Sequence, residues 1–203
     1  MGDRIRTDKQ VKAGLDRESV ISAAAKMANE QGLEALSMKR LAAQLGVQPP
    51  SLYNHIGSLA ELKRELMLSG WRELEQRMLR SAAGIGGWEA FRAMCREFYR
   101  FAVGNHGVFN AMLWYNKYSD SEAMAATGEL FTYFYRTMAG LNISRDTSEH
   151  LMRTIRGFLE GFALLVNNGA FGHSASIDES FELSLEVLIA GMKTLEEHGD
   201  NNT

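Results

Sequence analysis

The sequence predicts an all-α fold, with a three-helix helix-turn-helix domain at the N-terminus and a larger helical domain after it. The chain has 203 residues but only two prolines, a residue type that interrupts helices. Apolar residues recur at spacings of three and four along most of the chain, and no segment alternates as a strand does. Because 45% of the residues are hydrophobic, a packed core is expected.

The composition also indicates where the protein works. There is no run of about 18 apolar residues, so no membrane span is expected. The first residues are polar, without the apolar core of a signal peptide, and the single Cys95 has no partner for an internal disulfide. These features favour a cytoplasmic protein. Cys95 lies among apolar neighbours and is interpreted as a small core residue, with a nucleophile as the alternative.

Charge is distributed unevenly, although the net formal charge is only -3. Residues 1–64 carry 10 Lys and Arg against 7 Asp and Glu, whereas residues 65–203 carry 12 against 18. A basic head on an acidic body indicates that only the head meets a polyanion.

Start and stop residues define the first helices. Asp16 is a favourable N-cap for a helix that Gly32 ends. Ser37 caps a second short helix, and Gly46 stops it. A third short helix is predicted over residues 48–55.

A long amphipathic helix is predicted from residue 58 to residue 81, closed by the glycine-rich stretch AAGIGG. The change of role falls within this helix, so we divide the chain into a domain of residues 1–64, with a flexible arm at 1–14, and a domain of residues 65–203. Further helices are predicted at 87–103, 105–114, 120–140, 145–168 and 177–197. In the last of them a narrow apolar seam suits a partner helix, and its members are Phe181, Leu185, Leu188, Met192 and Leu195.

Residues 37–55 follow the order helix, glycine turn, helix. This is the order of a helix-turn-helix, whose second helix lies in the DNA major groove. The adjacent Pro49 and Pro50 fit the first turn of a helix, because N–H groups there lack intrahelical acceptors. Hydroxyl, amide and imidazole groups follow in the sequence SLYNH and suit phosphates and base edges. A short capped surface helix without DNA contacts is the alternative.

The stretch LDRESVISAAAKMANEQGLEALSMKRLAAQLGVQPPSLYNHIGSLAELKREL resembles the DNA-binding domain of the TetR family of bacterial repressors. The rest of the chain matches that family's helical ligand-binding and dimerisation domain in general character. Within it, NAMLWYN and RGFLEGFALLVNNGAFG resemble a subgroup with a Trp-rich helix and a late GAFG segment.

The resemblance implies a homodimeric, ligand-responsive repressor that binds a pseudo-palindromic operator in double-stranded DNA and is released by a small effector. Neither a cofactor nor a metal is expected. The positions that match DNA-contacting residues are Ser37, Met38, Lys39, Pro49, Pro50, Ser51, Tyr53 and His55. Lys39 is the best candidate for a base contact, because lysine donates to guanine acceptors.

The resemblance breaks down at the start of the long helix, where many relatives carry a phosphate-binding lysine. Leu59 occupies that position here, and Lys63 follows one turn later. The phosphate contact is therefore expected to be weaker, or to come from the N-terminal arm. The basic residues of the arm are Arg4, Arg6, Lys9 and Lys12, and a solvated tail is the other interpretation.

Large apolar side chains crowd residues 88–138, and most are interpreted as core. A subset is expected to line a cavity for a small apolar or aromatic effector, namely Phe98, Met112, Trp114 and Tyr115. Arg156 and Glu160 lie four residues apart on an apolar helix. Three interpretations are open: the pair anchors the ligand, it crosses a dimer interface, or it is an ordinary ion pair within the helix. The last two helices of two chains are expected to form a four-helix dimer interface that buries the seam.

Nothing in the sequence nominates an enzyme. The five histidines lack metal-ligand spacing, and no P-loop, dinucleotide fingerprint or nucleophile elbow occurs. The alternatives to a regulator are an all-helical interaction protein or an enzyme that does not bind DNA. A steep fall of DNA affinity with salt distinguishes the regulator from both.

Overall fold

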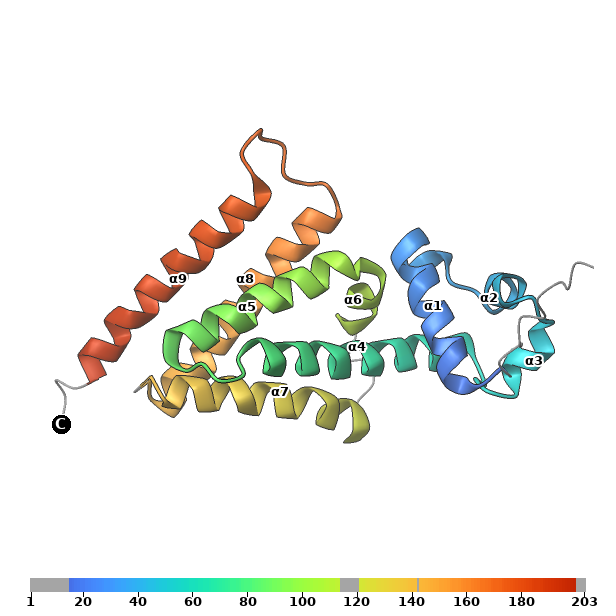
Figure 1. Cartoon of the computed structure of the whole chain (residues 1–203), viewed down its shortest axis with the longest axis horizontal. Coiled ribbons are helices and arrows are strands. Elements are labelled where there is room, and N and C mark those ends of the chain that lie inside the picture. The colour runs from blue at the N-terminus through green and yellow to red at the C-terminus, as the bar shows by residue number, and fades with distance from the viewer. Residues whose placement is uncertain (1–14, 114–120, 142, 200–203) are drawn as a thin grey trace, which may run out of the picture.

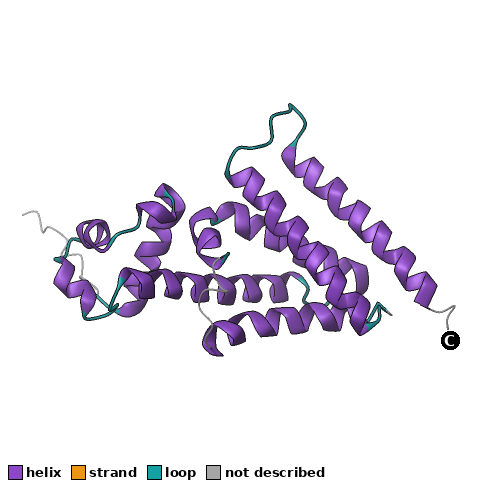
Figure 2. Ribbon diagram, turned by 180° about the vertical axis from the view of Figure 1, so that it is seen from behind, coloured by secondary structure: helices purple, strands orange, loops and turns teal. Residues whose placement is uncertain are grey.

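The computed structural model describes residues 15–113, 121–141 and 143–199, and within these ranges it consists of helices joined by loops and contains no strand (Figures 1 and 2). The predicted all-α class is confirmed. The elements are α1 (Arg17–Gln31), the 3-10 turn η1 (Leu33–Ala35), α2 (Met38–Leu45), α3 (Pro49–Tyr53), α4 (Leu59–Ser81), α5 (Gly87–Gly104), α6 (His106–Met112), α7 (Ser121–Ala139), α8 (Arg145–Asn167) and α9 (Ile177–Gly199).

Side-chain caps fix the starts of the N-terminal helices where the sequence predicts them. Asp16 accepts a hydrogen bond of 2.8 Å from the Ser19 amide, and Ser58 accepts one of 3.0 Å from the Glu61 amide. Each cap satisfies an amide that has no acceptor within its own helix. The structure differs in two details: η1 is unpredicted, and α3 ends at Tyr53, two residues earlier than expected.

The head, formed by α1–α3, lies at one end of the molecule, and α4 leads from it into the body (Figure 1). The head has a small core of its own, in which Leu41, Leu52 and Ile56 have no exposed surface. Along α4, Leu62 and Leu66 are buried in the first turns and Met78 near the end. One continuous helix therefore contributes to the core of both the head and the body.

The short helix α6 lies between α1 and α4 (Figure 1), and glycines allow both approaches. A Cβ atom on Gly107 would collide with the backbone carbonyl of Ala28 in α1. A Cβ atom on Gly70 in α4 would lie 2.7 Å from Val108 Cγ1 and from Met112 Sδ. Backbone this close to a neighbouring helix requires glycine, so α6 is wedged tightly between head and body.

Asn29 of α1 reinforces this contact with polar bonds. Its Oδ1 atom accepts hydrogen bonds of 3.0 Å from the amides of Gly107 and Val108, at the start of α6. Its Nδ2 atom donates to Asn105 Oδ1 at 3.1 Å. A side chain from the head thus caps a helix of the body, because the first amides of α6 have no acceptors within that helix.

The last helix, α9, is attached to α5 by polar pairs along one edge. Arg92 pairs with Glu186, Arg96 pairs with Glu182, and the Tyr99 hydroxyl donates to Asp178 at 2.9 Å. Burial and then the Asp178 carboxylate raise the pKa of Tyr99 to about 12. Beside this edge, the Phe181 ring stacks on Tyr99 with centroids 4.0 Å apart.

Cys95 is fully buried in α5, which confirms its interpretation as a core residue. Burial raises the pKa of its thiol, so the reactive thiolate is disfavoured.

Replacing Gly107 with Ala is expected to lower the free energy of unfolding by about 1–3 kcal/mol, because the added methyl group must push α6 away from α1. Urea denaturation followed by circular dichroism measures the change. Gly104→Ala is the matched control, since a Cβ atom there meets no neighbour. Equal stability of the two variants would contradict the proposed close packing.

Candidate functional site

The turn between α2 and α3 has the geometry of a tight helix-turn-helix. Gly46 adopts φ 68° and ψ 30°, a left-handed conformation that glycine reaches at little cost. The Val47 amide donates to the Ala42 carbonyl at 3.0 Å and closes the end of α2. The chain can therefore change direction between the two helices with its backbone bonds satisfied.

The paired prolines occupy the first two positions of α3, as predicted. Gln48 precedes them without a side-chain cap, and the Ser51 amide donates to the Gln48 carbonyl at 2.9 Å. Because the prolines carry no N–H, the exposed start of this helix has two fewer unsatisfied donors.

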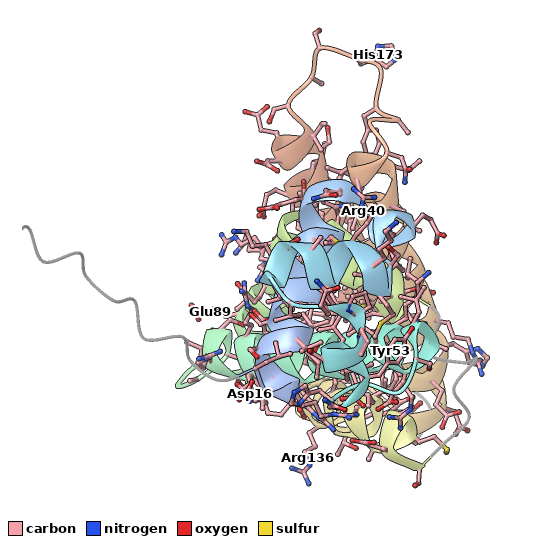
Figure 3. The ribbon with its side chains drawn as sticks, turned by 90° about the vertical axis from the view of Figure 1, so that its right-hand side faces the viewer. Asp16, Arg40, Tyr53, Glu89, Arg136 and His173 are labelled. Atoms are coloured by element: carbon pink, nitrogen blue, oxygen red, sulfur yellow. The ribbon has the colours of Figure 1, made fainter. Side chains whose placement is uncertain are left out.

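Most of the predicted DNA-contacting side chains reach the surface. Lys39, Pro50 and Tyr53 are exposed, Tyr53 to 52%. Half-buried members of the set are Ser37, Pro49, Ser51 and His55. Figure 3 looks along the molecule onto this end and shows Tyr53 on the side facing the viewer. Lys39 has no ion pair or hydrogen bond with any residue in the described ranges, so its charge is available to a partner.

Met38 requires a correction. It is only 8% exposed and belongs to the head's core, so its side chain is not available to DNA. The first position of a helix that packs against α1 can face inward as easily as outward, and the motif alone did not distinguish the two. The chain also contains Arg40, which the motif did not nominate and which instead donates to the Ala35 carbonyl at 3.0 Å.

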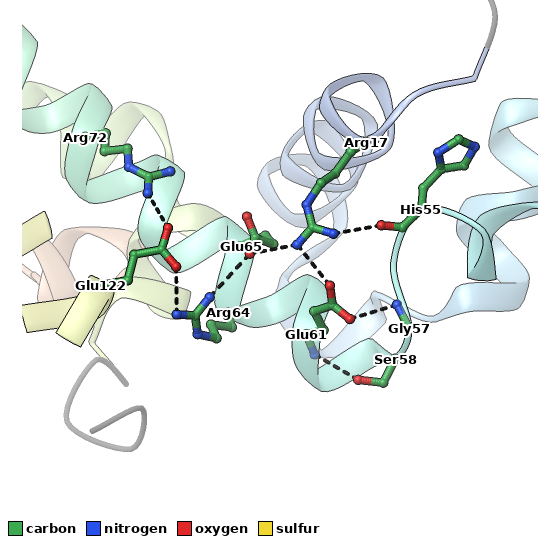
Figure 4. Close-up of polar contacts among 9 residues, drawn as sticks. All are labelled: Arg17, His55, Gly57, Ser58, Glu61, Arg64, Glu65, Arg72 and Glu122. Carbon is green, nitrogen blue, oxygen red and sulfur yellow. Dashed lines mark hydrogen bonds and ion pairs between the residues drawn. The ribbon is translucent and has the colours of Figure 1, made fainter. Parts of the chain in front are cut away.

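Arg17 fixes the position of α3 relative to α4 (Figure 4). Its guanidinium donates to the His55 carbonyl at 2.8 Å and to Glu61 Oε1 at 2.9 Å. Glu61 Oε2 in turn accepts from the Gly57 amide at 2.8 Å. The Gly57 amide, and then the Arg17 guanidinium, lower the pKa of Glu61. The segment that follows α3 is therefore held by a charged side chain from α1 and another from α4.

The same charges continue into the body (Figure 4). Arg17 pairs with Glu65 at 3.0 Å, and Glu65 pairs with Arg64 at 3.4 Å. Glu122, at the start of α7, accepts from Arg64 at 3.0 Å and from Arg72 at 2.6 Å. A chain of alternating charges thus joins the head to α7 across the surface of α4.

The lysine that follows the helix start is engaged elsewhere. Lys63 lies 3.8 Å from Glu34 of η1. Leu59, at the position where many relatives have a lysine, is half-buried. The arm residues proposed to replace this contact lie outside the described residues.

A partly open cavity of about 20 Å³ lies between α4, α5, α7 and α8. Three of the residues predicted to hold an effector line it, namely Phe98, Arg156 and Glu160. Arg156 Nε donates to Glu160 Oε1 at 2.7 Å, and both side chains are largely buried. Met112 is fully buried but packs towards Gly70 instead of lining this cavity. Trp114 and Tyr115 lie outside the described residues.

The seam predicted for dimerisation requires the second correction. Phe181, Leu185 and Met192 are at most 4% exposed, and Leu188 is half-buried, so the seam packs within the same chain. Leu195, the last member of the seam, is 47% exposed, and a different stripe of α9 also remains uncovered, formed by Leu183 at 68% and Val187 at 64%. Periodicity correctly predicted that the seam is buried, but its partner is the chain's own α5 and α8.

On α8, two glycines and a leucine have open space beside them. A Cβ atom on Gly157 or Gly161 would meet no neighbour, and Leu165 is 46% exposed. Glycines spaced by four residues allow another helix to approach the backbone closely. The uncovered faces of α8 and α9 together form what we call the α8/α9 face.

Two further observations concern the described part of the chain. No three His, Cys, Asp or Glu side chains gather there in an arrangement suited to a metal ion. None of its helices combines the length and apolar character needed to cross a membrane.

An exposed helix-turn-helix joined through a shared helix to an all-helical body defines a DNA-binding regulator of the helix-turn-helix class. Comparison with known families narrows this class. Residues 20–66 match the model described as bacterial regulatory proteins, tetR family, and residues 91–188 match the tetracyclin repressor-like C-terminal domain. The chain belongs to the TetR family of bacterial transcriptional regulators.

Relatives and solved structures agree with this assignment. The uncharacterized HTH-type transcriptional regulator YobS of Bacillus subtilis is 28% identical over 180 residues, which are 88% of this chain and 93% of YobS. An uncharacterized HTH-type regulator of Mycobacterium tuberculosis is 28% identical over 98% of this chain and 93% of its own length. The crystal structure of TetR from Acinetobacter baumannii superposes with a TM-score of 0.71 at 19% identity, covering 90% of this chain and 99% of that one.

Replacing Glu61 with Gln is expected to destabilise the protein at pH 7 by about 0.2–1 kcal/mol, the range for a screened, partly exposed ion pair. The folded-state pKa of Glu61 lies below its ordinary value of 4.5, so its contribution is complete above that value. The contribution is lost as the pH falls through the folded-state pKa. Urea denaturation of both proteins across this range measures the difference.

Glu34→Gln is the control, because that carboxylate is 91% exposed and pairs only at 3.8 Å. A stability gap between the native protein and Glu61→Gln that does not narrow in acid would exclude the assigned role of the carboxylate.

Proposed function

We propose that the protein is a ligand-responsive transcriptional repressor of the cytoplasm. It binds a pseudo-palindromic operator in double-stranded DNA as a homodimer, and a small apolar or aromatic effector releases it. The observation that carries the proposal is the exposed Tyr53 of α3, on a head that also exposes Lys39, which has no ion pair within the described residues.

The chemistry of α2 and α3 supports contact with duplex DNA. Lysine donates to guanine acceptors and to phosphates, and the tyrosine hydroxyl bonds phosphate oxygens. The apolar edge of Pro50 suits contact with thymine methyl groups or deoxyribose. The caps and the Arg17 contacts hold α3 in one orientation, which lowers the entropy lost when it binds in the groove.

The α8/α9 face supports dimerisation through these two helices. A two-fold axis through this face would pair Leu183 and Val187 with the same stripe of a second chain, and the glycines of α8 would allow close helix contact. Two heads on one dimer would then reach successive major grooves, about 34 Å apart.

The cavity supports binding of an apolar effector. Its lining is mostly aromatic and aliphatic, with Arg156 and Glu160 as the polar groups. A variant of the A. baumannii TetR, whose structure superposes with a TM-score of 0.69, forms a complex with minocycline. Because the cavity of about 20 Å³ is far smaller than a drug-sized molecule, the ligand must displace the surrounding helices.

Two connections would carry that displacement to the head. The charges from Glu122 to Arg17 connect α7 to the segment after α3. The α6 wedge connects the body to α1 through Gly107 and Asn29. A ligand that shifts α7 or α6 therefore changes the orientation of the two heads, and an operator with fixed half-site spacing is released.

Tyr53→Ala is expected to weaken binding to the preferred operator by about 10- to 100-fold, because a groove-facing contact is lost. The operator is first selected from random duplex DNA, and affinity is then measured by fluorescence anisotropy at several salt concentrations. Tyr53→Phe keeps the ring and serves as the matched variant, and circular dichroism confirms that both fold. Unchanged affinity of Tyr53→Ala would remove α3 from the interface, and the absence of any salt-dependent DNA complex would favour an interaction protein.

Replacing Leu183 and Val187 together with Asp is expected to produce folded monomers, because both side chains are exposed in the single chain and would be buried in the dimer. Analytical ultracentrifugation measures the oligomeric state. Met124→Asp is the control, since Met124 is 70% exposed but lies on α7. A double variant that sediments as a dimer would mean that another face mediates assembly.

A further inference from the structure

Three hollows between α7 and α8 meet at one side chain. Phe131 lines the inner cavity, an adjoining surface pocket of about 200 Å³ and an open groove of about 440 Å³. Tyr135 lines both outer spaces, and Arg156 lines the cavity and the surface pocket. Phe131 is only half-buried, so rotation of its ring would connect the groove with the interior.

The size of the groove matches that of a small-molecule site. Its volume of about 440 Å³ falls within the range of roughly 300–1,000 Å³ that ligand pockets occupy. The interior alone, at about 20 Å³, holds no ligand atoms beyond a single small group. A molecule that enters must therefore begin in the groove and push the Phe131 ring aside.

The two outer spaces are lined by more positive than negative charge. Their ionisable residues are Arg136, Arg145, Arg153, Arg156 and the single acid Glu149. Arg145 lies 3.6 Å from Glu149, and Arg156 is bonded to Glu160 of the inner cavity. The opposite charges within each pair neutralise each other. Two arginines remain whose positive charge is not neutralised.

Arg136 and Arg153 carry the charge that remains. Neither makes a hydrogen bond or an ion pair with a residue of the described ranges, and both are exposed. Figure 3 shows Arg136 extending outward from the body. Arg145 stays close by, with its guanidinium carbon 3.8 Å from the Tyr135 ring centroid, so one face of the groove combines an aromatic surface with cations.

We propose that the effector is an amphiphilic anion, with an apolar or aromatic body that displaces Phe131 and one carboxylate, sulfonate or phosphate group that Arg136 and Arg153 bind at the rim. The inference rests on the proposed function, because it assigns the chemical class of that function's ligand. Guanidinium groups bind such oxyanions through charge-assisted, often bidentate hydrogen bonds.

A cationic ligand would meet repulsion at the same rim, and a neutral one would gain no charge-assisted hydrogen bond from the two exposed arginines. The rim therefore discriminates by charge before the apolar body reaches the interior. Because Phe131 and Glu122 lie on the same helix, displacement of the ring also acts on the helix whose first turn pairs with Arg64 and Arg72.

Two dyes with nearly the same apolar body test the inference in the full-length protein. The anion is 1-anilinonaphthalene-8-sulfonate, and N-phenyl-1-naphthylamine lacks the sulfonate. Fluorescence titration gives the affinity for each. The native protein is expected to bind the anion more tightly. The double variant Arg136→Ala with Arg153→Ala should weaken binding of the anion about tenfold while changing binding of the neutral dye less than twofold.

Two further variants locate the binding site. Gly128→Phe fills the groove without a clash at its Cβ position, and it should weaken binding of both dyes. Arg100→Ala, on the exposed surface of α5, should change neither affinity. If the neutral dye binds at least as tightly as the anion, or if the double variant retains full affinity for the anion, the assigned class is wrong. If Gly128→Phe leaves both dyes bound, the groove is not the site.

DNA binding, measured in the same samples, keeps the two proposals apart. Release from the selected operator by the anion supports both. Release by the neutral dye alone overturns the anionic class but leaves the ligand-responsive regulator intact. If the protein binds no duplex DNA at all, the proposed function fails, whatever the dyes show.

Discussion

The close approach of α6 to α1 is the constraint on which the position of the head depends. The Gly107 backbone touches that of Ala28, and Asn29 caps the helix that begins beside it. No side chain fits between the two elements at Gly107, so we expect α1 to move together with α6. On its other side α6 contacts α4 at Gly70. Because interiors at this packing density shift between discrete arrangements and do not deform smoothly, the head and the first half of the body move as one unit.

The ion pairs on the surface of α4 provide a second, weaker connection between the head and the body. Glu122 and Arg72 are about half exposed, so each of their ion pairs contributes little stability alone. These ion pairs matter because of the elements that they join. Arg64 reaches both Glu122 of α7 and Glu65, while Arg17 reaches Glu65 and the carbonyl of His55. A displaced α7 would leave Arg64 and Arg72 to find other partners, and the hold on the segment after α3 would change without any loss of the packed core.

The sequence predicted the positions of the helices well, because the residues that start and end a helix lie close to it in the sequence. Asp16, Ser37 and Ser58 each cap the helix that follows, and caps depend on two or three neighbouring residues. The element against which a helix packs, in contrast, is not determined by neighbouring residues in the sequence. The spacing of Phe181, Leu185 and Met192 predicted a buried stripe, but the same spacing serves a helix of the same chain or of another. The pairs of Arg92 with Glu186 and Arg96 with Glu182 identify the true partner, and they join residues too far apart in sequence for any motif to connect. The prediction that Met38 contacts DNA was wrong for a similar reason, since the burial of this side chain depends on where α1 lies.

Helix α8 explains how a ligand in one subunit can influence the geometry of a dimer. Arg145, Glu149, Arg153 and Arg156 recur at spacings of three and four along the side that meets α7 and the groove. Gly157, Gly161 and Leu165 recur along a neighbouring side, which the single chain leaves uncovered. One rigid helix therefore borders the ligand groove, the core and the proposed contact with a second chain. A rotation of α8 that admits a ligand beside Phe131 must also rotate the glycine stripe against its partner. Since α6 packs against both head and body, even a small change at that contact would be enlarged at the distant ends of the molecule, where the proposed dimer places its two copies of α3.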